Sequence, residues 1–312
     1  MPPSNNESLY LNCYGLTSAP FRLSPDPEFF FPSKPHIAAR KVLKYAIQND
    51  EGFMILSGPA GTGKTLLLRV LLQETGKGKI TTVLTNPVLS PSGLLHQILL
   101  ELGLKVDASI GEENLLATFQ KVLLKIASLN KDILVIVDEA QNIPLKTLEY
   151  LRMLSNIETN QRKLLQILLT GQPELEDLLK DPRLAQLSQR IAVHETLRPF
   201  SATETLEYVN YRLAKAGRGD LGLSFFAKKA LFRLTGGIPR LVNRLMDRTL
   251  LIACTDYKGK LTRRHIYAAA KTLPGDTNLK LFGLLPSLGY VFVAILVFAL
   301  VLSAFILRVD HG

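Results

Sequence analysis

The amino-acid sequence predicts an α/β fold, in which a parallel five-stranded sheet is followed by an α-helical domain and one apolar C-terminal helix. The first observation is that, over residues 51–199, short apolar runs alternate with segments whose apolar residues recur every three or four positions. This alternation is typical of a parallel sheet covered by helices on both faces. The second observation is that only helical spacing remains after Pro199. The third is that residues 281–307 contain no charged side chain.

Five apolar runs predict the five strands. They read GFMILSG, ITTVLTN, DILVIVDEA, LLQILLTG and IAVHETL in chain order. Segments with helical spacing separate them, and a helix over residues 64–75 directly follows the first run. We therefore place the α/β core at residues 51–199 and a helical domain at residues 200–278. The first helix of that domain begins with SATE, which matches a capping box with Ser201 as N-cap and Glu204 three residues later.

Residues 1–50 form a separate segment. Prolines crowd the stretch APFRLSPDPEFFFPSKPH. Because proline fixes its own φ, lacks an amide donor and restricts the preceding residue, this composition predicts an extended arm and not a strand or a helix. Helical spacing returns at residues 36–49, with Ile37, Leu43 and Ile47 on the expected buried face.

The sequence GPAGTGKT at residues 58–65 fits the pattern G-x-x-x-x-G-K-[ST] between a strand and a helix. In this setting glycines let the backbone curl so that its amides face phosphate groups, and the helix N-terminus adds positive potential. We expect Lys64 to reach the β- and γ-phosphates of a nucleoside triphosphate and Thr65 to ligate Mg²⁺. The expected nucleotide contacts are Gly58, Pro59, Ala60, Gly61, Thr62, Gly63, Lys64, Thr65 and Leu66.

Two carboxylates follow the third apolar run, in the sequence ILVIVDEA. They are expected at the C-terminal end of a buried strand, where open α/β sheets bind their ligands. We expect Asp138 to hold the Mg²⁺ through water, and Glu139 to orient and deprotonate the attacking water. A metal-binding carboxylate beside a separate base favours hydrolysis of the triphosphate over its storage.

The order of these motifs, followed by LLTGQPEL, RLAQLSQRI and GGIPRLVNRL, resembles the AAA+ ATPases. The stretch YGLTSAPFRLSPDPEFFFPSKPH, together with GQPEL and QLSQRI, is similar more closely to the ExeA-type, or general secretion pathway protein A, ATPases of Gram-negative bacteria. The resemblance covers roughly residues 9–275 and continues through the apolar segment. It implies an ATP hydrolase that uses ATP and Mg²⁺.

The resemblance also implies roles for polar residues beyond the phosphate loop. Gln172, or Thr170 just before it, would be the sensor that touches the γ-phosphate or the attacking water. Arg190, with Arg183 as its rival, would be the arginine finger offered to a neighbouring subunit. Arg240, in GIPR, would be a second sensor that reaches back from the helical domain.

An arginine supplied by a neighbour implies a homo-oligomer with its chemistry at subunit boundaries. In this family type the N-terminal arm covers the nucleotide base, so residues 26–36 are expected to form the wall beside the adenine. The family usually carries a peptidoglycan-binding domain after the membrane span. This chain stops five residues past Leu307, so cell-wall binding does not carry over.

The net charge of +10 is concentrated before the apolar segment, since residues 201–280 contain 15 basic and 6 acidic side chains. Residues 287–308 are long enough for a transmembrane helix. The positive-inside rule then predicts a single-pass protein of a bacterial inner membrane with its ATPase domain in the cytoplasm, where anionic lipid would attract the basic region.

In a reducing cytoplasm Cys13 and Cys254 are expected to be free thiols.

These features predict a membrane-anchored ATPase that drives the assembly or operation of a secretion or cell-envelope complex. Its partner would be a membrane-embedded or periplasmic protein of that complex. The alternative is a DNA-binding AAA+ ATPase of the transposition-helper type, which the basic helical domain favours. A third possibility is a scaffold that binds ATP but barely hydrolyses it, and the presence of both Asp138 and Glu139 argues against it.

Overall fold

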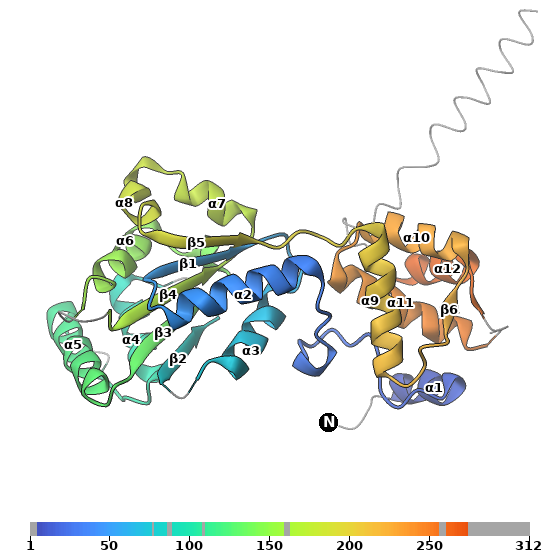
Figure 1. Ribbon diagram of the computed structural model, residues 1–312, viewed down its shortest axis with the longest axis horizontal. Helices are drawn as coiled ribbons and strands as arrows, with labels where there is room; N and C mark the ends of the chain where they lie inside the picture. The colour runs from blue at the N-terminus through green and yellow to red at the C-terminus, as the bar shows by residue number, and fades with distance from the viewer. Residues whose placement is uncertain are drawn as a thin grey trace, which may run out of the picture.

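The computed structural model describes residues 5–76, 78–85, 89–107, 110–158, 163–255 and 260–273, with side chains from residue 10 onward. Two bodies lie side by side in Figure 1, one built around a sheet and the other made of helices. Within the described ranges no helix is both long and apolar enough to cross a lipid bilayer. The transmembrane helix expected over residues 287–308 lies outside them.

The sheet contains five parallel strands, which confirms that part of the expected fold. Its strand order is β2-β3-β4-β1-β5, so the first strand lies between the fourth and the fifth. Strands β1, β3 and β4 are completely buried, because neighbouring strands and helices surround them, and this explains their mainly apolar sequences. The strands are β1 (Phe53–Ser57), β2 (Lys79–Leu84), β3 (Asp132–Val137), β4 (Leu165–Thr170) and β5 (Ile191–Thr196).

Helices cover both faces of the sheet. Alternate strand residues point to opposite faces, so Phe53 and Ile55 enter one core while Met54 and Leu56 enter another. The first core is completed by α4 (Pro91–Glu101), α5 (Glu112–Ser128), α6 (Leu145–Leu154) and α7 (Pro173–Leu179). The second is completed by α2 (Lys34–Gln48) and α3 (Lys64–Glu74). Shorter turns fill the connections: η1 (Pro27–Phe29), η2 (Ala140–Asn142), η3 (Pro182–Leu184) and α8 (Ala185–Ser188).

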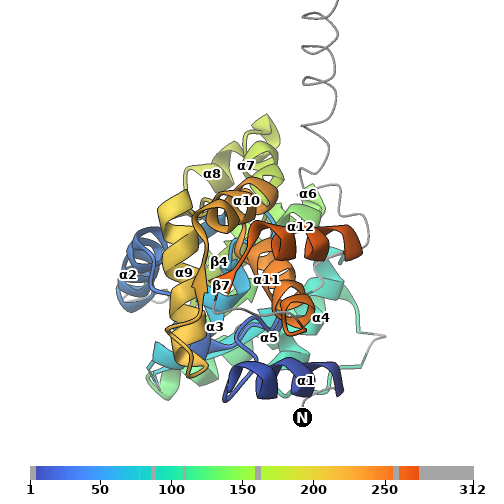
Figure 2. The ribbon, with the colours of Figure 1, turned by 90° about the vertical axis from the view of Figure 1, so that its right-hand side faces the viewer.

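The second body is helical, as Figure 2 shows end-on. Its first helix begins with the expected capping box, since Ser201 Oγ accepts from the Glu204 amide and Glu204 accepts from the Ser201 amide. Two short parallel strands, β6 (Gly222–Leu223) and β7 (Lys260–Leu261), connect its helices. The helices are α9 (Ala202–Lys215), α10 (Phe225–Thr235), α11 (Pro239–Ala253) and α12 (Arg263–Thr272).

The N-terminal residues depart from the expected extended arm. Helix α1 (Asn5–Tyr14) packs on α11, and the hydroxyl of Tyr14 donates to the carbonyl of Leu250 over 3.0 Å. Tyr10 and Tyr14 are fully buried in the core of the helical body, together with Phe21. The expectation of an extended arm without a helix was wrong for residues 5–14, because α1 obtains its burial from a helix more than 230 positions away, which local composition does not reveal.

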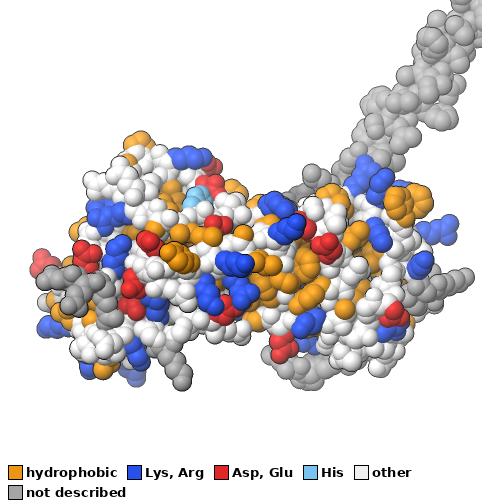
Figure 3. Space-filling model, in the orientation of Figure 1, with side chains coloured by type: hydrophobic (Ala, Val, Ile, Leu, Met, Phe, Trp, Pro, Cys, Tyr) orange, Lys and Arg blue, Asp and Glu red, His pale blue; other side chains and the backbone are white. Residues whose placement is uncertain are grey.

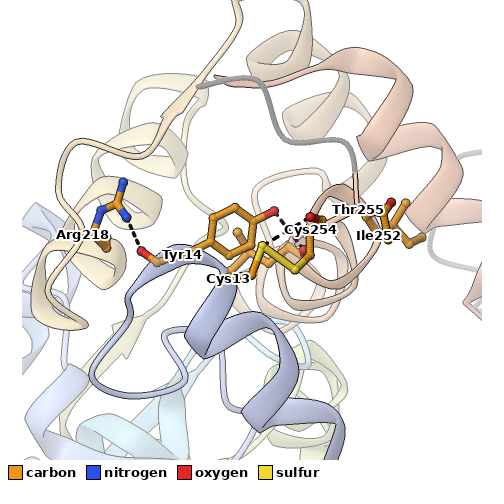
Figure 4. Close-up of a disulfide and its surroundings, with 7 residues drawn as sticks. Cys13, Tyr14, Arg218, Ile252, Cys254 and Thr255 are labelled. Atoms are coloured by element: carbon orange, nitrogen blue, oxygen red, sulfur yellow. Dashed lines mark hydrogen bonds between the residues drawn. A yellow bond between two sulfur atoms is a disulfide. The ribbon is translucent and has the colours of Figure 1, made fainter.

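The two cysteines also differ from expectation. Cys13 in α1 and Cys254 at the end of α11 form a disulfide, with their Cα atoms 6.0 Å apart (Figure 4). The prediction of two free thiols was therefore wrong. That prediction rested on an expected reducing cytoplasm and on the spacing of the two cysteines in the sequence. The disulfide instead follows from the packing of α1 beside the C-terminal end of α11.

Candidate functional site

A cleft of about 450 Å³ lies where the C-terminal edge of the sheet meets the helical body. Four parts of the chain line it: the N-terminal arm, the glycine-rich loop, the ends of β3 and β4, and helices α9 and α11. The arm contributes residues 22–26, and the loop contributes Ala60, Gly61, Gly63, Lys64, Thr65 and Leu66. The remaining lining residues are Glu139, Gln172, Tyr208, Arg212, Pro239, Arg240 and Asn243.

The glycine-rich loop connects β1 to α3 and depends on its glycines for geometry. Gly58 and Gly61 have φ values of +145° and +80°, which L side chains rarely adopt. A Cβ on Gly61 would lie 2.7 Å from the Cβ of Arg240, so only glycine allows α11 to approach the loop this closely. The backbone amide of Arg240 donates to the carbonyl of Gly61 over 3.2 Å, which connects the loop directly to the helical body.

Lys64 begins α3 and is 5% exposed. Its Nζ donates to the carbonyls of Gly58 and Pro59, over 2.6 and 3.2 Å. Burial lowers the pKa of the ammonium, and the nearby carboxylates of Glu139 and Asp138 act in the opposite direction. A poorly hydrated cation at a helix N-terminus is an environment suited to a bound anion.

Asp138 follows β3 and lies beside the start of α3. Its Oδ2 accepts from the hydroxyl of Thr65 over 2.9 Å, while its Oδ1 accepts from the hydroxyl of Thr170 over 2.5 Å and from the amide of Glu139 over 3.0 Å. The structure thus brings together both residues expected to hold Mg²⁺. Hydroxyl and carboxylate oxygens are the hard donors that Mg²⁺ prefers, so the donor set fits the ion.

Glu139 adopts a left-handed backbone conformation, with φ +54°, and this turns its side chain into the cleft. Its Oε2 accepts from Nε2 of Gln141 over 2.7 Å and from Nε2 of Gln172 over 3.1 Å. The Oε1 of Gln141 in turn accepts from the Gln172 amide over 3.1 Å. Gln141 therefore connects the ends of β3 and β4. The sequence analysis did not predict a role for Gln141. The only indication in the sequence was its position two residues after Glu139.

The two arginines expected to act at the site lie in different places. Arg240, on the first turn of α11, is exposed and lines the cleft. Arg190 is exposed just before β5 and does not line the cleft; its Nη1 donates to Oδ1 of Asn156 and to Oγ of Ser155. Its rival Arg183 is paired with Asp181 on the surface. The geometry therefore gives no support for a role of Arg190 or Arg183 in the cleft of the same subunit. The exposed positions of these two arginines are compatible with a role toward a neighbouring subunit.

The arm lines the cleft slightly upstream of the expected residues 26–36. Residues 22–26 face it, and Arg212 from α9 holds them there. Arg212 is 3% exposed and donates to the backbone carbonyls of Pro20 and Arg22, with its guanidinium 4.7 Å from the ring centroid of Phe29. Burial lowers its pKa. Arg212, together with Tyr208 and Asn243, was missed because its importance depends on contacts with arm residues about 190 positions away.

His36 connects the arm to the loop. Its Nε2 lies 3.0 Å from the Thr62 carbonyl and its Nδ1 lies 2.7 Å from Oγ of Ser33. A carbonyl can only accept, so we assign the hydrogen to Nε2, and Nδ1 then accepts from the Ser33 hydroxyl. Burial lowers the pKa of His36, which favours this neutral form. The side chain thereby fixes the loop at Thr62 from outside the cleft.

Comparisons with known proteins define the class. Residues 47–179 match the family model of an AAA domain, a range that contains the loop and both acids. The Drosophila ORC bound to DNA has a similar fold, with a TM-score of 0.62 and 20% identity over 86% of this chain and 67% of that chain. The Aeropyrum pernix ORC2 protein in its ADPNP–ADP complexes has a TM-score of 0.60 and 14% identity over 81% of this chain and 73% of that chain. The fold is thus the nucleotide-binding AAA+ fold.

A more specific similarity connects the chain to one type within that class. It is 38% identical over 267 residues to general secretion pathway protein A from Aeromonas hydrophila. The match covers 86% of this chain and 49% of that protein, so the chain spans about half the length of its curated relative. The resemblance expected from the motifs is confirmed: the chain is similar to general secretion pathway protein A over most of its own length.

Proposed function

We propose that the chain binds ATP with Mg²⁺ in the cleft and hydrolyses it. The observation that carries this proposal is the convergence of the loop with the two acids: Lys64 at the helix start, Thr65 hydrogen-bonded to Asp138, and Glu139 facing the cleft. Loop amides and Lys64 would bind the phosphates. Thr65 and Asp138 would hold Mg²⁺, which supplies positive charge beside the transferred phosphoryl group.

Glu139 is the base in this proposal. Two amide donors, from Gln141 and Gln172, hold one of its oxygens and leave the other to accept a proton from water. Gln172 would sense the γ-phosphate, and Gln141 would position the other two side chains. Arg240 would contact the phosphates from the helical body. Arg190 would serve the site of a neighbouring subunit, so the active form would be a homo-oligomer.

The cellular role that we propose is a membrane-anchored ATPase for a secretion or cell-envelope complex. Similarity to general secretion pathway protein A and the uncharged residues 281–307 support it. The anchor would hold the ATPase domain at the cytoplasmic face of a bacterial inner membrane. A partner within the membrane or periplasm would receive the conformational change. A disulfide is unusual for a protein in the cytoplasm.

A DNA-binding AAA+ ATPase is the second candidate. The observation that favours it is the excess of nine positive charges over residues 201–280, which could neutralise several phosphates. It predicts duplex binding whose affinity falls steeply with salt and does not depend on residues 281–312. The membrane role predicts that the protein stays in the membrane fraction at high salt and leaves it in detergent.

The hydrolase proposal is tested by phosphate release from the full chain in lipid, with Mg²⁺ and ATP. Glu139→Gln is expected to retain nucleotide binding and to lose about 100-fold or more in rate, because the base is removed. Glu113→Gln, an exposed glutamate on α5, is the matched control and should match wild type. Equal rates for Glu139→Gln and wild type would refute the assignment of the base. Unchanged nucleotide affinity in Lys64→Ala would refute the site itself.

A further inference from the structure

Two adjacent aromatic side chains stand exposed on the helical body. Phe225 and Phe226 begin α10 and are 67% and 63% exposed, with their rings edge-to-face at 5.5 Å between centroids. The hydroxyl of Ser224 accepts from the Ala227 amide and fixes the start of the helix. Since α10 buries Ala227, Ala230 and Leu231 against the core, the two rings are held in solvent by the helix register.

Basic side chains surround these rings. The Nζ of Lys229 lies 5.6 Å from the ring centroid of Phe225. Phe226 borders an open hollow of about 540 Å³ whose other lining residues are Ser224, Thr262, Arg263 and Arg264. Figure 3 shows hydrophobic side chains between Lys and Arg side chains over α10. We call Phe225, Phe226, Lys228, Lys229, Arg263 and Arg264 the aromatic–basic patch.

The patch carries no compensating negative charge on its own helices. The sequences of α10 and α12, which pack against each other, contain no aspartate or glutamate. Its four cations are all exposed. Exposed aromatic rings beside four exposed cations complement an anionic surface that has an apolar layer directly beneath it.

The position of the patch along the chain also favours contact with a membrane surface. Helix α12 ends at Thr272, nine residues before the uncharged stretch begins at Leu281. Nine residues span at most about 30 Å when fully extended. If residues 281–307 enter a bilayer, the C-terminal end of α12 is thus held within about 30 Å of the membrane surface, and the patch lies about 15 Å away at the other end of this ten-residue helix.

We propose that the aromatic–basic patch docks on anionic phospholipid, with both phenylalanine rings inserted at the headgroup level and the four cations over the lipid phosphates. This proposal rests on the membrane anchoring proposed above and adds the orientation of the helical body. Aromatic rings favour the membrane interface, and each Lys or Arg near an anionic surface contributes about 1 kcal/mol, roughly fivefold in affinity. Duplex phosphates would engage the cations and leave the two rings in water.

The absence of tryptophan from the sequence makes the test direct. Phe226→Trp in the full chain introduces a single fluorescent reporter into the patch. The protein is reconstituted in phosphatidylcholine vesicles with or without phosphatidylglycerol, each containing brominated lipid as a quencher. We expect quenching and a blue shift only with phosphatidylglycerol, reduced by salt. Tyr45→Trp, which replaces an exposed aromatic residue on α2, is the matched control and should remain unquenched.

Charge reversal within the patch provides a second experiment. Adding Lys229→Glu and Arg263→Glu to Phe226→Trp should abolish the dependence on phosphatidylglycerol. An unquenched indole in protein that remains in the membrane fraction would overturn the docking proposal while leaving anchoring intact. Release of the protein by salt would instead overturn the anchoring. Quenching of the same indole by a single-stranded oligonucleotide, and not by lipid, would assign the patch to nucleic acid.

Discussion

Gly58, the first residue of the phosphate loop, offers the sharpest test of how the loop is built. A Cβ at this position would lie 2.3 Å from the carbonyl oxygen of Leu197 and 3.3 Å from its Cβ. That carbonyl cannot easily move away, because the Leu197 amide donates to Ser57 over 2.9 Å. The φ of +145° adds strain for any L side chain. We therefore expect Gly58→Ala to separate the loop from the end of β5.

The magnitude follows from these two effects. An unfavourable backbone conformation costs about 1–3 kcal/mol, and forcing packed groups apart costs about 1–3 kcal/mol more. We expect Gly58→Ala to lower the free energy of unfolding by about 2–6 kcal/mol, a large part of the roughly 5–15 kcal/mol of a typical domain. Urea denaturation followed by circular dichroism measures the loss, and ATP affinity should fall in parallel because the loop amides move.

The matched control is Gly76→Ala. Gly76 is exposed, its φ is not positive, and its added Cβ would meet nothing within 4 Å. Its unfolding free energy should stay within about 0.5 kcal/mol of wild type. Indistinguishable urea midpoints for Gly58→Ala and Gly76→Ala would refute the reasoning from the close approach of Leu197.

Two further predictions concern stability. The hydrogen bonds from Arg198 and from the Ser201 amide lower the pKa of Glu204 from 4.5 to about 2; this stabilisation is present above pH 4.5 and lost as the pH falls toward 2. Glu204→Gln should therefore cost about 1 kcal/mol at pH 7 because Arg198 is largely exposed, and nothing near pH 2, as urea titrations at both pH values would reveal. Removal of the disulfide by Cys254→Ser should cost about 2–4 kcal/mol without reductant, and dithiothreitol should bring wild type down to the variant. If dithiothreitol left the wild-type midpoint unchanged, the crosslink would not form in solution.

The sheet and its loop could be predicted because their sequence signals are local. A strand covered on both faces needs a largely apolar sequence, and each of the three central strands has one, with Gln166 as the polar exception in β4. The phosphate loop has a fixed spacing of glycine, lysine and threonine between a strand and a helix. Asp138 follows from its place at a strand end, and its hydrogen bond to Thr65 agrees with that prediction.

The features that the sequence did not predict depend on contacts between segments far apart in the chain. Helix α1 and the Cys13–Cys254 disulfide need α11 beside the N-terminus, and no periodicity within ten residues indicates that arrangement. The position of Gln141 follows from the left-handed turn at Glu139, a conformation that non-glycine residues seldom adopt. Arg212 is an arginine buried against backbone carbonyls and aromatic rings, so its sequence neighbours give no hint of its partners.

The placement of the arm adds a second connection between the two bodies beside the cleft. The chain crosses between the two bodies twice, before α2 and after β5, and the crossings meet where Phe31 and His36 lie 5.6 and 5.7 Å from Phe200 between ring centroids. Tyr14 and Phe21 are packed in the helical core, whereas Arg69 of α3 donates to the carbonyl of Pro25 over 2.7 Å, so residues 22–26 lie between contacts to both bodies. The backbone amide of Arg240 likewise donates to the carbonyl of Gly61, so the two bodies could separate at the cleft only by breaking the contacts of both the arm and Arg240.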